Sequence, residues 1–356
     1  MFYTEEIKLN QAADLLSLCG LTMPRAVDYT VGVFLRSDGA DRLVACGSLK
    51  GDMIQGIAVD PKFQGEDLTA KVITHLAQKA SEKGIHSLYL FTKPEKAAQF
   101  AGLGFRLAAS ARPYAALLEW GSAGISQYVE KLRECKKMVF AAESAAECTA
   151  KSEAHNAAEC TANSPRPIGA LVMNCNPFTR GHRYLIEKAA AACSHVFLLV
   201  VEEDVSEFSF GDRFAMVKAG TADLKNVTVL PGGRYAVSSL TFPSYFTKED
   251  NLAHAHAAID AELFAQIIAP ALSVSVRFVG TEPYSQVTEI YNETLKKRLP
   301  KAGITVEEIP RLTAGGEPVS ASRVRQILHA EGADSEKLAE LLPETTLNYL
   351  RKISQS

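Results

Sequence analysis

The sequence predicts an α/β protein with two domains, the second of which is built on a parallel sheet. The chain has 356 residues, which is long for a single hydrophobic core. Residues 141–166 contain no large apolar side chain and divide the chain into two parts. After them, apolar strand-like runs alternate with helical patterns. This alternation is typical of a parallel sheet with helices on both faces.

The composition predicts a folded, soluble protein, because 47% of the residues are hydrophobic and 22% are charged. The 38 basic and 41 acidic residues nearly balance, which argues against a nucleic-acid partner. No apolar run is long enough for a membrane helix, and the N-terminus carries two glutamates where a signal peptide is basic. We therefore expect a cytoplasmic protein without a membrane partner. The seven scattered cysteines form no CxxC pair and predict free thiols and no zinc site.

The first domain, predicted over residues 1–140, has the order of three strands, a helix, a strand, a short helix and a final strand. "VGVFLR" and "RLVACGSLK" flank the turn "SDGAD", which is a hairpin signal, and "MIQGIAV" is the third strand. "DLTAKVITHLAQKASEKG" has apolar residues at helical spacing and ends at Gly84. "HSLYLFT", "PEKAAQFA" and "GLGFRLAAS" complete the order.

Residues 141–166 are predicted to be a linker. They are rich in Ala, Ser, Thr and Glu and contain "AAECTA" twice. A segment that cannot bury a core is expected to be solvated and partly helical. We expect Cys148, His155 and Cys160 to be exposed bystanders, because a flexible linker does not preorganise a metal site.

The second domain is predicted over residues 167–356. Its strands are expected at 168–173, 196–201, 226–230, 275–279 and 304–309, and its helices at 182–193, 211–223, 256–269 and 284–298. Ligands of such sheets bind beyond the carboxyl ends of the strands. The stretch "NPFTRGH" at 176–182 follows the first strand and opens the first helix, so it is placed to bind a ligand.

The residue types in "NPFTRGH" suit a phosphate. The first turn of a helix offers free N–H groups and the positive end of the helix dipole. Gly181 lets a phosphate approach the backbone, and Pro177 stiffens the turn. Thr179 adds a hydroxyl, and His182 can donate a hydrogen bond, more strongly as the imidazolium. Taken alone, the stretch is also consistent with an ordinary helix start.

"NPFTRGH" resembles the (H/T)xGH signature of the nucleotidyltransferase superfamily, with Thr179 in the first position. "VSASRVRQIL" at 319–328 resembles the second signature of that superfamily, ISSTxxR. Ser320 and Ser322 match its hydroxyl positions, and Arg325 matches its arginine. The second stretch alone could be a capped surface helix. The two together, in this order and on this sheet pattern, favour a Rossmann-like nucleotide-binding domain.

Five blocks resemble the citrate lyase ligase family and cover most of 168–330. They are "MNCNPFTRGHRYLIEKAA", "EFSFGDRFAMVKAGTADL", "TFPSYFTKED", "RFVGTEPYSQVTEIYN" and "PVSASRVRQIL". The resemblance implies that ATP, acetate and a thiol on the acyl-carrier subunit of citrate lyase give AMP, pyrophosphate and the acetyl thioester. The thiol would belong to a phosphoribosyl-dephospho-CoA group, and Mg²⁺ would accompany the ATP.

The resemblance also implies roles for single residues. His182 and Thr179 would stabilise the α-phosphate, and Arg325 would hold the β- and γ-phosphates with Ser320 and Ser322. Gly280 and Thr281 belong to the stretch "VGTEP". Their backbone groups either approach the adenine or the ribose of ATP, or they form an ordinary turn at the end of a strand. The acidic residues of the loop "EEDVSEFSFGDR" either bind Mg²⁺ or form a solvated loop, and we favour the solvated loop. Arg213 in this loop is a further candidate, and no metal ligand is assigned. The remaining ATP contacts are expected from Asn176, Pro177, Phe178 and Gly181.

The first domain resembles the GNAT acyltransferase fold. "VDPKFQGEDLTAKVITHLAQKA" resembles its acyl-CoA loop and helix, but Asp67 and Thr69 replace small residues of that loop. A carboxylate beside a pyrophosphate would repel it, so acetyl-CoA catalysis is not expected. Gln64 and Gly65 are candidates for binding the CoA-like arm of the carrier subunit; otherwise the domain is structural or dimerising. Two further activities stay open: a nucleotidyltransferase that makes a dinucleotide cofactor, and a GNAT N-acetyltransferase.

Overall fold

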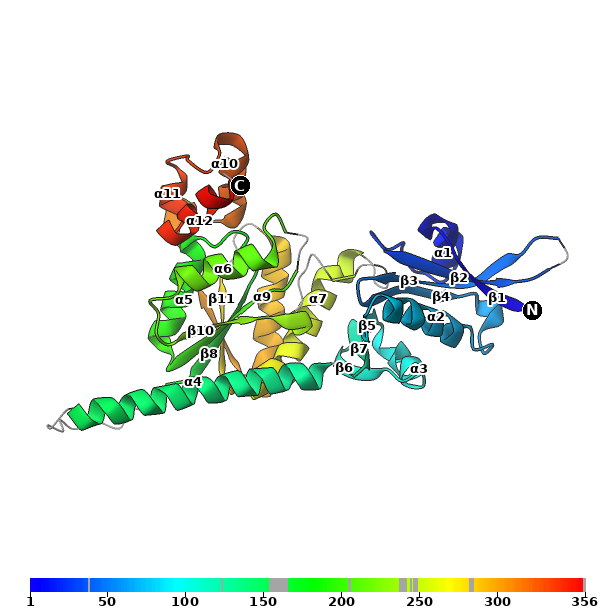
Figure 1. The fold of residues 1–356 in the computed structure, drawn as a ribbon, viewed down its shortest axis with the longest axis horizontal. Coiled ribbons are helices and arrows are strands. Elements are labelled where there is room, and N and C mark those ends of the chain that lie inside the picture. Colours follow the sequence, from blue (N-terminus) through cyan, green and yellow to red (C-terminus); the bar gives the residue numbers. More distant parts are fainter. Residues whose placement is uncertain are drawn as a thin grey trace. The chain divides into compact units, whose positions relative to one another are not determined.

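The computed structural model describes residues 1–37, 39–122, 124–153, 166–203, 206–236, 242–243, 245, 249–281 and 285–354. The chain forms two compact units, which Figure 1 shows in the colours of the sequence. The first unit comprises Met1–Gln127 and Phe242–Glu262, and the second comprises Tyr128–Thr241 and Leu263–Ser356. The first unit therefore includes a segment from the later part of the sequence, which the sequence patterns did not indicate.

The first unit contains a seven-stranded sheet in the order β1-β2-β3-β4-β5-β7-β6. Only β4 and β5 run parallel; the other neighbours are antiparallel. The predicted order of three strands, helix, strand, helix and strand is confirmed over residues 29–111, as expected of a GNAT-like domain. The strands are β1 (Phe2–Glu6), β2 (Tyr29–Leu35), β3 (Arg42–Lys50), β4 (Met53–Val59), β5 (Ser87–Thr92), β6 (Arg106–Ala111) and β7 (Ala115–Gly121). The helices are η1 (Leu9–Ala12), α1 (Ala13–Leu18), η2 (Pro61–Phe63), α2 (Leu68–Glu82), η3 (Pro94–Lys96) and α3 (Ala97–Ala101).

Helix α2 covers one face of this sheet. Gly47 of β3 allows the close approach, because a Cβ atom there would lie 2.5 Å from Cγ1 of Val72. The apolar positions that the helical spacing predicted are all buried, and they are Leu68, Val72, Ile73, Leu76 and Ala80.

The later segment enters the first unit where β4 and β5 diverge. The two strands pair only at Met53–Tyr89 and Ile54–Leu90. Beyond these pairs the hydroxyl of Tyr245 donates a hydrogen bond to the carbonyl oxygen of Phe91 (2.8 Å). Phe242 packs edge-on against the Phe91 ring at a centroid distance of 5.2 Å. Both aromatic side chains of the segment are buried, so it completes the core of this unit. Helix α7 (Glu249–Leu263) follows.

The second unit contains five parallel strands in the order β10-β9-β8-β11-β12. These are β8 (Ile168–Met173), β9 (His195–Val200), β10 (Val227–Pro231), β11 (Val276–Gly280) and β12 (Thr305–Ile309). Each strand begins and ends within one residue of its predicted bounds. The predicted parallel sheet is confirmed. It was readable because strands buried on both faces appear as continuous apolar runs.

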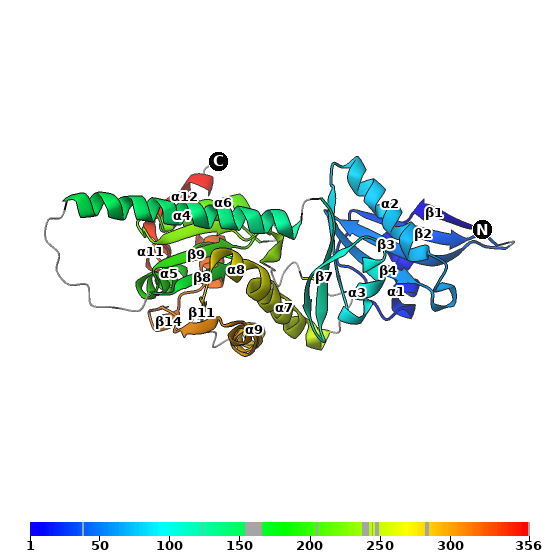
Figure 2. The ribbon, with the colours of Figure 1, turned by 90° about the horizontal axis from the view of Figure 1, so that it is seen from below.

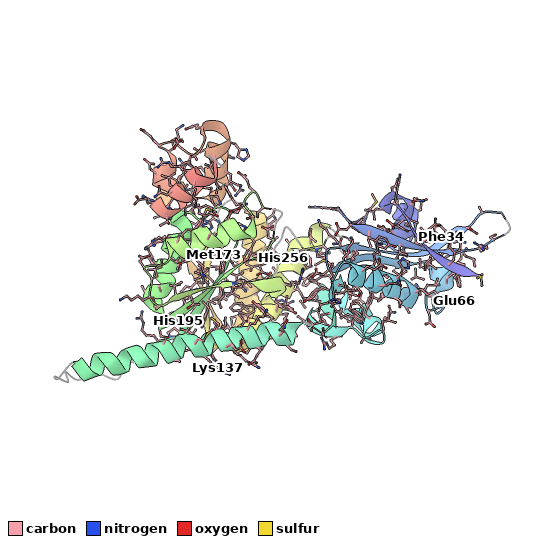
Figure 3. All side chains as sticks on the ribbon, viewed as in Figure 1. Phe34, Glu66, Lys137, Met173, His195 and His256 are labelled. Atoms are coloured by element: carbon pink, nitrogen blue, oxygen red, sulfur yellow. The ribbon has the colours of Figure 1, made fainter. Side chains whose placement is uncertain are left out.

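Helices cover both faces of this sheet (Figure 2). Val196, Leu198 and Val200 of β9 share one hydrophobic cluster with Ile186 of α5 (Arg180–Ala192) and Met216 of α6 (Phe210–Gly220). Alternate residues of a strand point to opposite faces. His195, labelled in Figure 3, accordingly faces the other way and approaches the ring of Phe140 on α4 (Ile125–Glu153) at 5.8 Å.

The remaining elements of the second unit are short. The β11–β12 connection contains α9 (Gln286–Arg298) and η6 (Leu299–Ala302). The hairpin β13 (Thr313–Ala314) and β14 (Glu317–Pro318) leads into α10 (Ala321–Glu331). The others are η4 (Gly233–Tyr235), the π-helical turn η5 (Phe264–Ile268), α8 (Ala269–Leu272), α11 (Leu338–Leu341) and α12 (Glu344–Ser354). No helix among the described residues is long and apolar enough to cross a membrane.

Helix α4 overlaps the predicted linker. Near its start, the Tyr128 hydroxyl donates to the carbonyl oxygen of Gly232 (2.7 Å), so this part of the helix belongs to the second unit. The predicted linker, 141–166, begins within the helix, and its residues 154–165, which include His155 and Cys160, lie outside the described residues. The units divide at Gln127 and Tyr128. The bounds proposed from the sequence, 1–140, 141–166 and 167–356, remain a prediction.

Candidate active site

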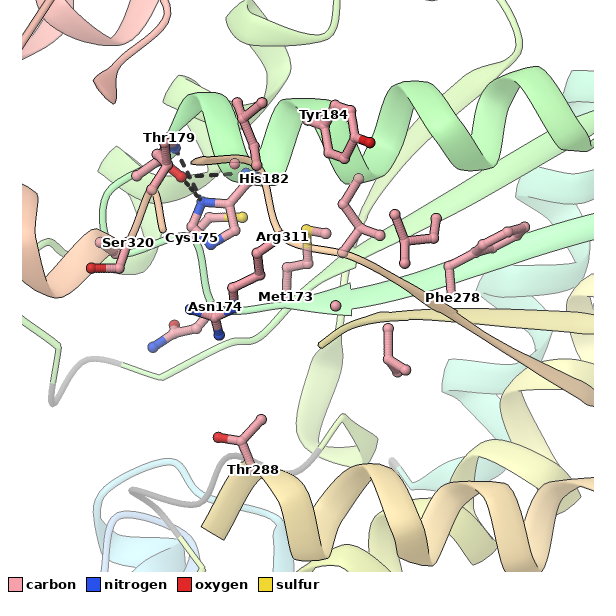
Figure 4. A pocket seen from close by; sticks show the side chains of 18 of the residues that line it. Met173, Asn174, Cys175, Thr179, His182, Tyr184, Phe278, Thr288, Arg311 and Ser320 are labelled. Atoms are coloured by element: carbon pink, nitrogen blue, oxygen red, sulfur yellow. Dashed lines mark hydrogen bonds between the residues drawn. The ribbon is translucent and has the colours of Figure 1, made fainter. Parts of the chain in front are cut away.

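A cavity of about 510 Å³ opens at the carboxyl ends of β8, β11 and β12 (Figure 4). Its walls are completed by the first turns of α5 and α10 and by one side of α9. This is the edge at which a parallel sheet of this kind binds ligands. The volume is that of a typical small-molecule site. Both predicted motifs contribute to the lining.

The first motif forms the N-terminus of α5. Thr179 is the N-cap residue: its Oγ1 accepts a hydrogen bond from the backbone N–H of His182 (3.3 Å). In return, the backbone N–H of Thr179 donates to Nδ1 of His182 (3.0 Å). A ring nitrogen that accepts this bond carries no proton, so the proton of the neutral ring is on Nε2. The cap therefore fixes both the orientation and the tautomer of His182.

His182 is a neutral donor in this pocket. Partial burial is the main reason that its pKa is lowered from 6.5 to about 4, and the positive charge of Arg311 lowers it further. A neutral imidazole can still donate a hydrogen bond from Nε2. The imidazolium considered from the sequence is not the form present near neutral pH. Positive charge in the pocket must therefore come from other residues.

The two motifs touch each other. Nη1 of Arg325 donates a hydrogen bond to the carbonyl oxygen of Asn176. A Cβ atom on Gly181 would lie only 2.9 Å from the carbonyl oxygen of Val319. Gly181 is therefore required for the approach of the second motif, in addition to any role toward a phosphate. This contact brings residues that are about 140 positions apart in the sequence into one site.

The second motif forms the N-terminus of α10. Ser320 is the N-cap residue, and its Oγ accepts from the backbone N–H of Arg323 (3.2 Å). Oγ of Ser322 accepts from Nη2 of Arg325 (3.2 Å). Nε of Arg325 lies 3.6 Å from a carboxylate oxygen of Glu207, whose other oxygen is 2.9 Å from Nε2 of His329. The guanidinium of Arg325 is thus held on three sides.

The structure separates the remaining candidates into those that line the cavity and those that do not. Asn176 and Gly280 line it, together with the catalytic candidates Thr179, His182 and Arg325 and with Gly181, Ser320 and Ser322. Pro177, Phe178 and Thr281 are not among its lining residues. Phe178 lies in the hydrophobic core, and Pro177 follows a cis peptide bond and is buried. Gln64 and Gly65 are exposed in the turn before α2 of the first unit.

Sequence reasoning missed two arginines that line the cavity. Arg277 is the second residue of β11, and its guanidinium stacks on Phe264 (4.3 Å) and donates to the hydroxyl of Tyr291 (2.7 Å). The sequence did contain a signal for Arg277, because its charge interrupts the apolar run "SVRFV". Arg311 lies just beyond β12. It belongs to neither motif. The sequence nevertheless placed it at the carboxyl end of a predicted strand, which is where ligands of such sheets bind.

The pocket is suited to an anion. Among the described residues of the chain, its lining includes three arginines, Arg277, Arg311 and Arg325, and no Asp or Glu. The described residues also contain no group of three or more His, Cys, Asp or Glu that could hold a metal ion. A protein-held Mg²⁺ site needs carboxylate oxygens. The described residues of the lining offer none.

Arg213 supports the pocket from outside. Its side chain is fully buried and does not line the cavity. Nη1 donates to the carbonyl oxygen of Asn174 (2.8 Å) and to that of Val201 (2.9 Å), and Nε donates to that of Phe208 (3.1 Å). Asn174 does line the cavity. Arg213 therefore fixes the ends of β8 and β9, and with them one wall of the pocket.

Comparisons with known proteins point to one family. The profile described as "Citrate lyase ligase C-terminal domain" matches residues 168–350. A protein of Klebsiella pneumoniae named [citrate [pro-3S]-lyase] ligase is 39% identical, covering 88% of this chain and 85% of the relative. The protein of the same name from Escherichia coli (strain K12) is 36% identical, covering 92% and 87%. Among solved structures, an acetyltransferase of Bacillus cereus is 17% identical and covers 34% of this chain and 100% of that chain, with a TM-score of 0.27.

Proposed function

The chain belongs to the citrate lyase ligase family, and we propose that it is an ATP-dependent acid–thiol ligase. It activates acetate as acetyl adenylate and transfers the acetyl group to a thiol of the citrate lyase acyl-carrier subunit. The thiol is that of the phosphoribosyl-dephospho-CoA group. AMP and pyrophosphate are released.

One observation carries this proposal: two helix N-termini and three arginines surround the cavity, and its described lining residues include no carboxylate. ATP, acetate and pyrophosphate are all anions. Helix N-termini and guanidinium groups bind phosphate and carboxylate oxygens well. The contact between Arg325 and Asn176 brings both motifs to the same cavity, so both can act on one polyphosphate.

The roles of the residues follow from their places. Nε2–H of His182 donates to an oxygen of the α-phosphate, and Thr179 holds the ring in the orientation for this bond. Arg325 holds the β- and γ-phosphates with Ser320 and Ser322. A carboxylate oxygen of acetate attacks the α-phosphorus, and the bond to the bridging oxygen of pyrophosphate breaks. The carrier thiol then attacks the acetyl carbon, and AMP leaves. Mg²⁺ is part of the nucleotide substrate.

Gln64 and Gly65 of the first unit remain the proposed contacts of the carrier's arm. Both are exposed, and Gly65 has a φ of 101°, which the backbone of this turn requires and which favours glycine. The place between β4 and β5 is filled by Tyr245 and Phe242. An arm bound to this unit would therefore lie on the exposed turn and not between the diverging strands.

The test combines the protein with Mg·ATP, acetate and deacetylated citrate lyase, and follows citrate cleavage together with AMP and pyrophosphate. The ligase restores cleavage and releases both products. A synthase of dinucleotide cofactors would release pyrophosphate but retain AMP in its product. An acetyltransferase would consume acetyl-CoA and ignore ATP. In the same assay His182→Ala should be slower on the order of 10²–10³-fold, as when one donor to a transition-state oxyanion is removed. Near-normal release of pyrophosphate by this variant would refute the role of His182.

A further inference from the structure

Arg311 is the pocket arginine that lies near His182. It lies two residues beyond the end of β12 and lines the cavity. Figure 4 shows its side chain extending past His182 toward Asn174. His182 is the residue proposed to contact the α-phosphate, so an arginine beside it would also lie close to that phosphate.

The position of Arg311 is fixed by the neighbouring strand. Its backbone N–H donates to Oγ1 of Thr281 (3.2 Å), and its Nε donates to the carbonyl oxygen of Thr281 (2.7 Å). Thr281 in turn donates its backbone N–H to the carbonyl oxygen of Ile309 (2.9 Å). A guanidinium held at Nε keeps its plane and needs little reorganisation when an anion arrives. Groups fixed in this way are the ones that stabilise developing charge most effectively.

The chemistry requires a positive charge at this point. The attack of a carboxylate on a phosphate brings two anions together, and negative charge accumulates on the phosphoryl oxygens. His182 is neutral near neutral pH and supplies a hydrogen bond only. A positive group close to His182 is therefore needed, and Arg311 is placed there.

The other two arginines of the pocket have different partners. Arg277 is almost completely buried, stacked on Phe264 and bonded to the Tyr291 hydroxyl, so it belongs to the wall of the cavity. Arg325 is bonded to Asn176 in the contact between the two motifs. Arg311 is distinguished by its approach to His182, which is close enough to affect the ring's titration.

We propose that Arg311 is a catalytic residue whose guanidinium neutralises the charge that develops between the α-phosphate and the attacking carboxylate. The bond from the carboxylate oxygen to phosphorus forms as the bond to pyrophosphate breaks, and Arg311 keeps its protons throughout. The identity of the acid rests on the proposed function. The place of the α-phosphate beside His182 rests on it too, whereas the place of Arg311 beside His182 does not.

The experiment compares Arg311→Gln and Arg311→Lys with the control Arg323→Gln, which removes an arginine of the second motif that does not line the cavity. Acetate-dependent exchange of pyrophosphate into ATP gives kcat and KM, and calorimetry gives the Kd for Mg·ATP. Arg311→Gln should lower kcat on the order of 10²–10³-fold and change the Kd by less than about threefold. Arg311→Lys should recover part of the loss, because it retains the charge without the planar fork. The control should behave as wild type.

Three results would overturn the proposal: an unchanged kcat, a loss confined to the Kd for Mg·ATP, or a loss confined to the KM for acetate. The last two would make Arg311 a ground-state binding residue. Thermal unfolding checks that the variants are folded. Arg311→Gln loses the bonds to Thr281 and could unfold for that reason. In that case the kcat of Arg311→Lys tests the catalytic role of Arg311. A folded Arg311→Lys with the kcat of wild type would contradict that role.

An NMR titration of His182 provides a readout that does not depend on activity. Arg311→Gln should raise the pKa of His182 from about 4, although it should remain below 6.5 because burial is the larger cause. An unchanged pKa would place the guanidinium away from the ring and overturn the proposal. Failure of the proposed function would look different: the wild-type protein would show no acetate-dependent exchange, while the titration shift would persist.

Discussion

Arg325 in the second motif donates a hydrogen bond to the main-chain carbonyl oxygen of Asn176 in the first motif. Nη2 of the same guanidinium donates to Ser322 (3.2 Å), and its Nε faces Glu207 (3.6 Å). The arginine that the proposal assigns to the β- and γ-phosphates therefore also joins the two motifs. Its environment explains how two short sequences far apart in the chain form one polyphosphate site.

Glu207 should position Arg325 for ATP. Glu207→Gln removes the charge that faces Nε, so the guanidinium should be held less firmly. Because the pair is partly exposed, we expect a loss of about 1 kcal/mol, seen as a roughly fivefold higher KM for ATP with an unchanged KM for acetate. His329→Gln is the matched control, because it removes the other partner of Glu207 and leaves Arg325 untouched. Equal changes in the two KM values, or an equal effect of His329→Gln, would rule out this positioning role.

His182 should make the stability of the fold depend on pH. Its pKa is lowered to about 4 in the folded protein, so the unfolded chain binds a proton more readily. Its contribution to stability is complete above about pH 6.5 and is lost as the pH falls toward 4. The free energy of unfolding of wild type should therefore fall more steeply over this range than that of His182→Asn. Urea unfolding at several pH values measures both slopes, with His86→Asn as a control at an exposed position. Parallel slopes for wild type and His182→Asn would contradict the buried neutral ring.

Arg213 should be a structural residue of the second unit. Arg213→Lys keeps the charge but leaves several buried carbonyl oxygens without a donor, which should lower the free energy of unfolding by about 2–4 kcal/mol. Arg133→Lys, at an exposed position on α4, should change it by less than about 0.5 kcal/mol. Urea unfolding followed by far-UV circular dichroism compares them. Similar small effects in both variants would show that the buried bonds contribute little.

Tyr245 should stabilise the first unit although it lies in the later part of the sequence. Tyr245→Phe removes the hydrogen bond to the Phe91 carbonyl oxygen and should cost about 1 kcal/mol. The chain's single tryptophan, Trp120, lies on β7, so its fluorescence reports the unfolding of this unit. The control is Tyr3→Phe, which removes an exposed hydroxyl bonded to Asp41 and should have little effect. If both variants unfold as wild type does, the hydrogen bond from Tyr245 to Phe91 does not stabilise the first unit.

Sequence patterns predicted the features that depend on local order. The central strands β8 and β9 are apolar on both faces, so their places could be read directly. The two motifs follow strand or turn signals, so their places could be read as well. The sequence did not assign Arg311 to the site, because this residue comes close to His182 only when β12 pairs with β11 in the folded sheet. The role of Tyr245 depends on a contact with Phe91, 154 residues away. The lowered pKa of His182 depends on its burial in the folded chain and on the charge of Arg311, which belongs to neither motif. Non-local packing decided each of these features.

Acetate-dependent exchange of labelled pyrophosphate into ATP tests the central claim most directly, because it requires the nucleotide pocket and no carrier protein. The wild-type chain should catalyse the exchange only when acetate and Mg·ATP are both present. His182→Ala should reduce it on the order of 10²–10³-fold without loss of folding. Exchange that proceeds without acetate, or no exchange by a folded wild-type protein that binds ATP, would contradict the account.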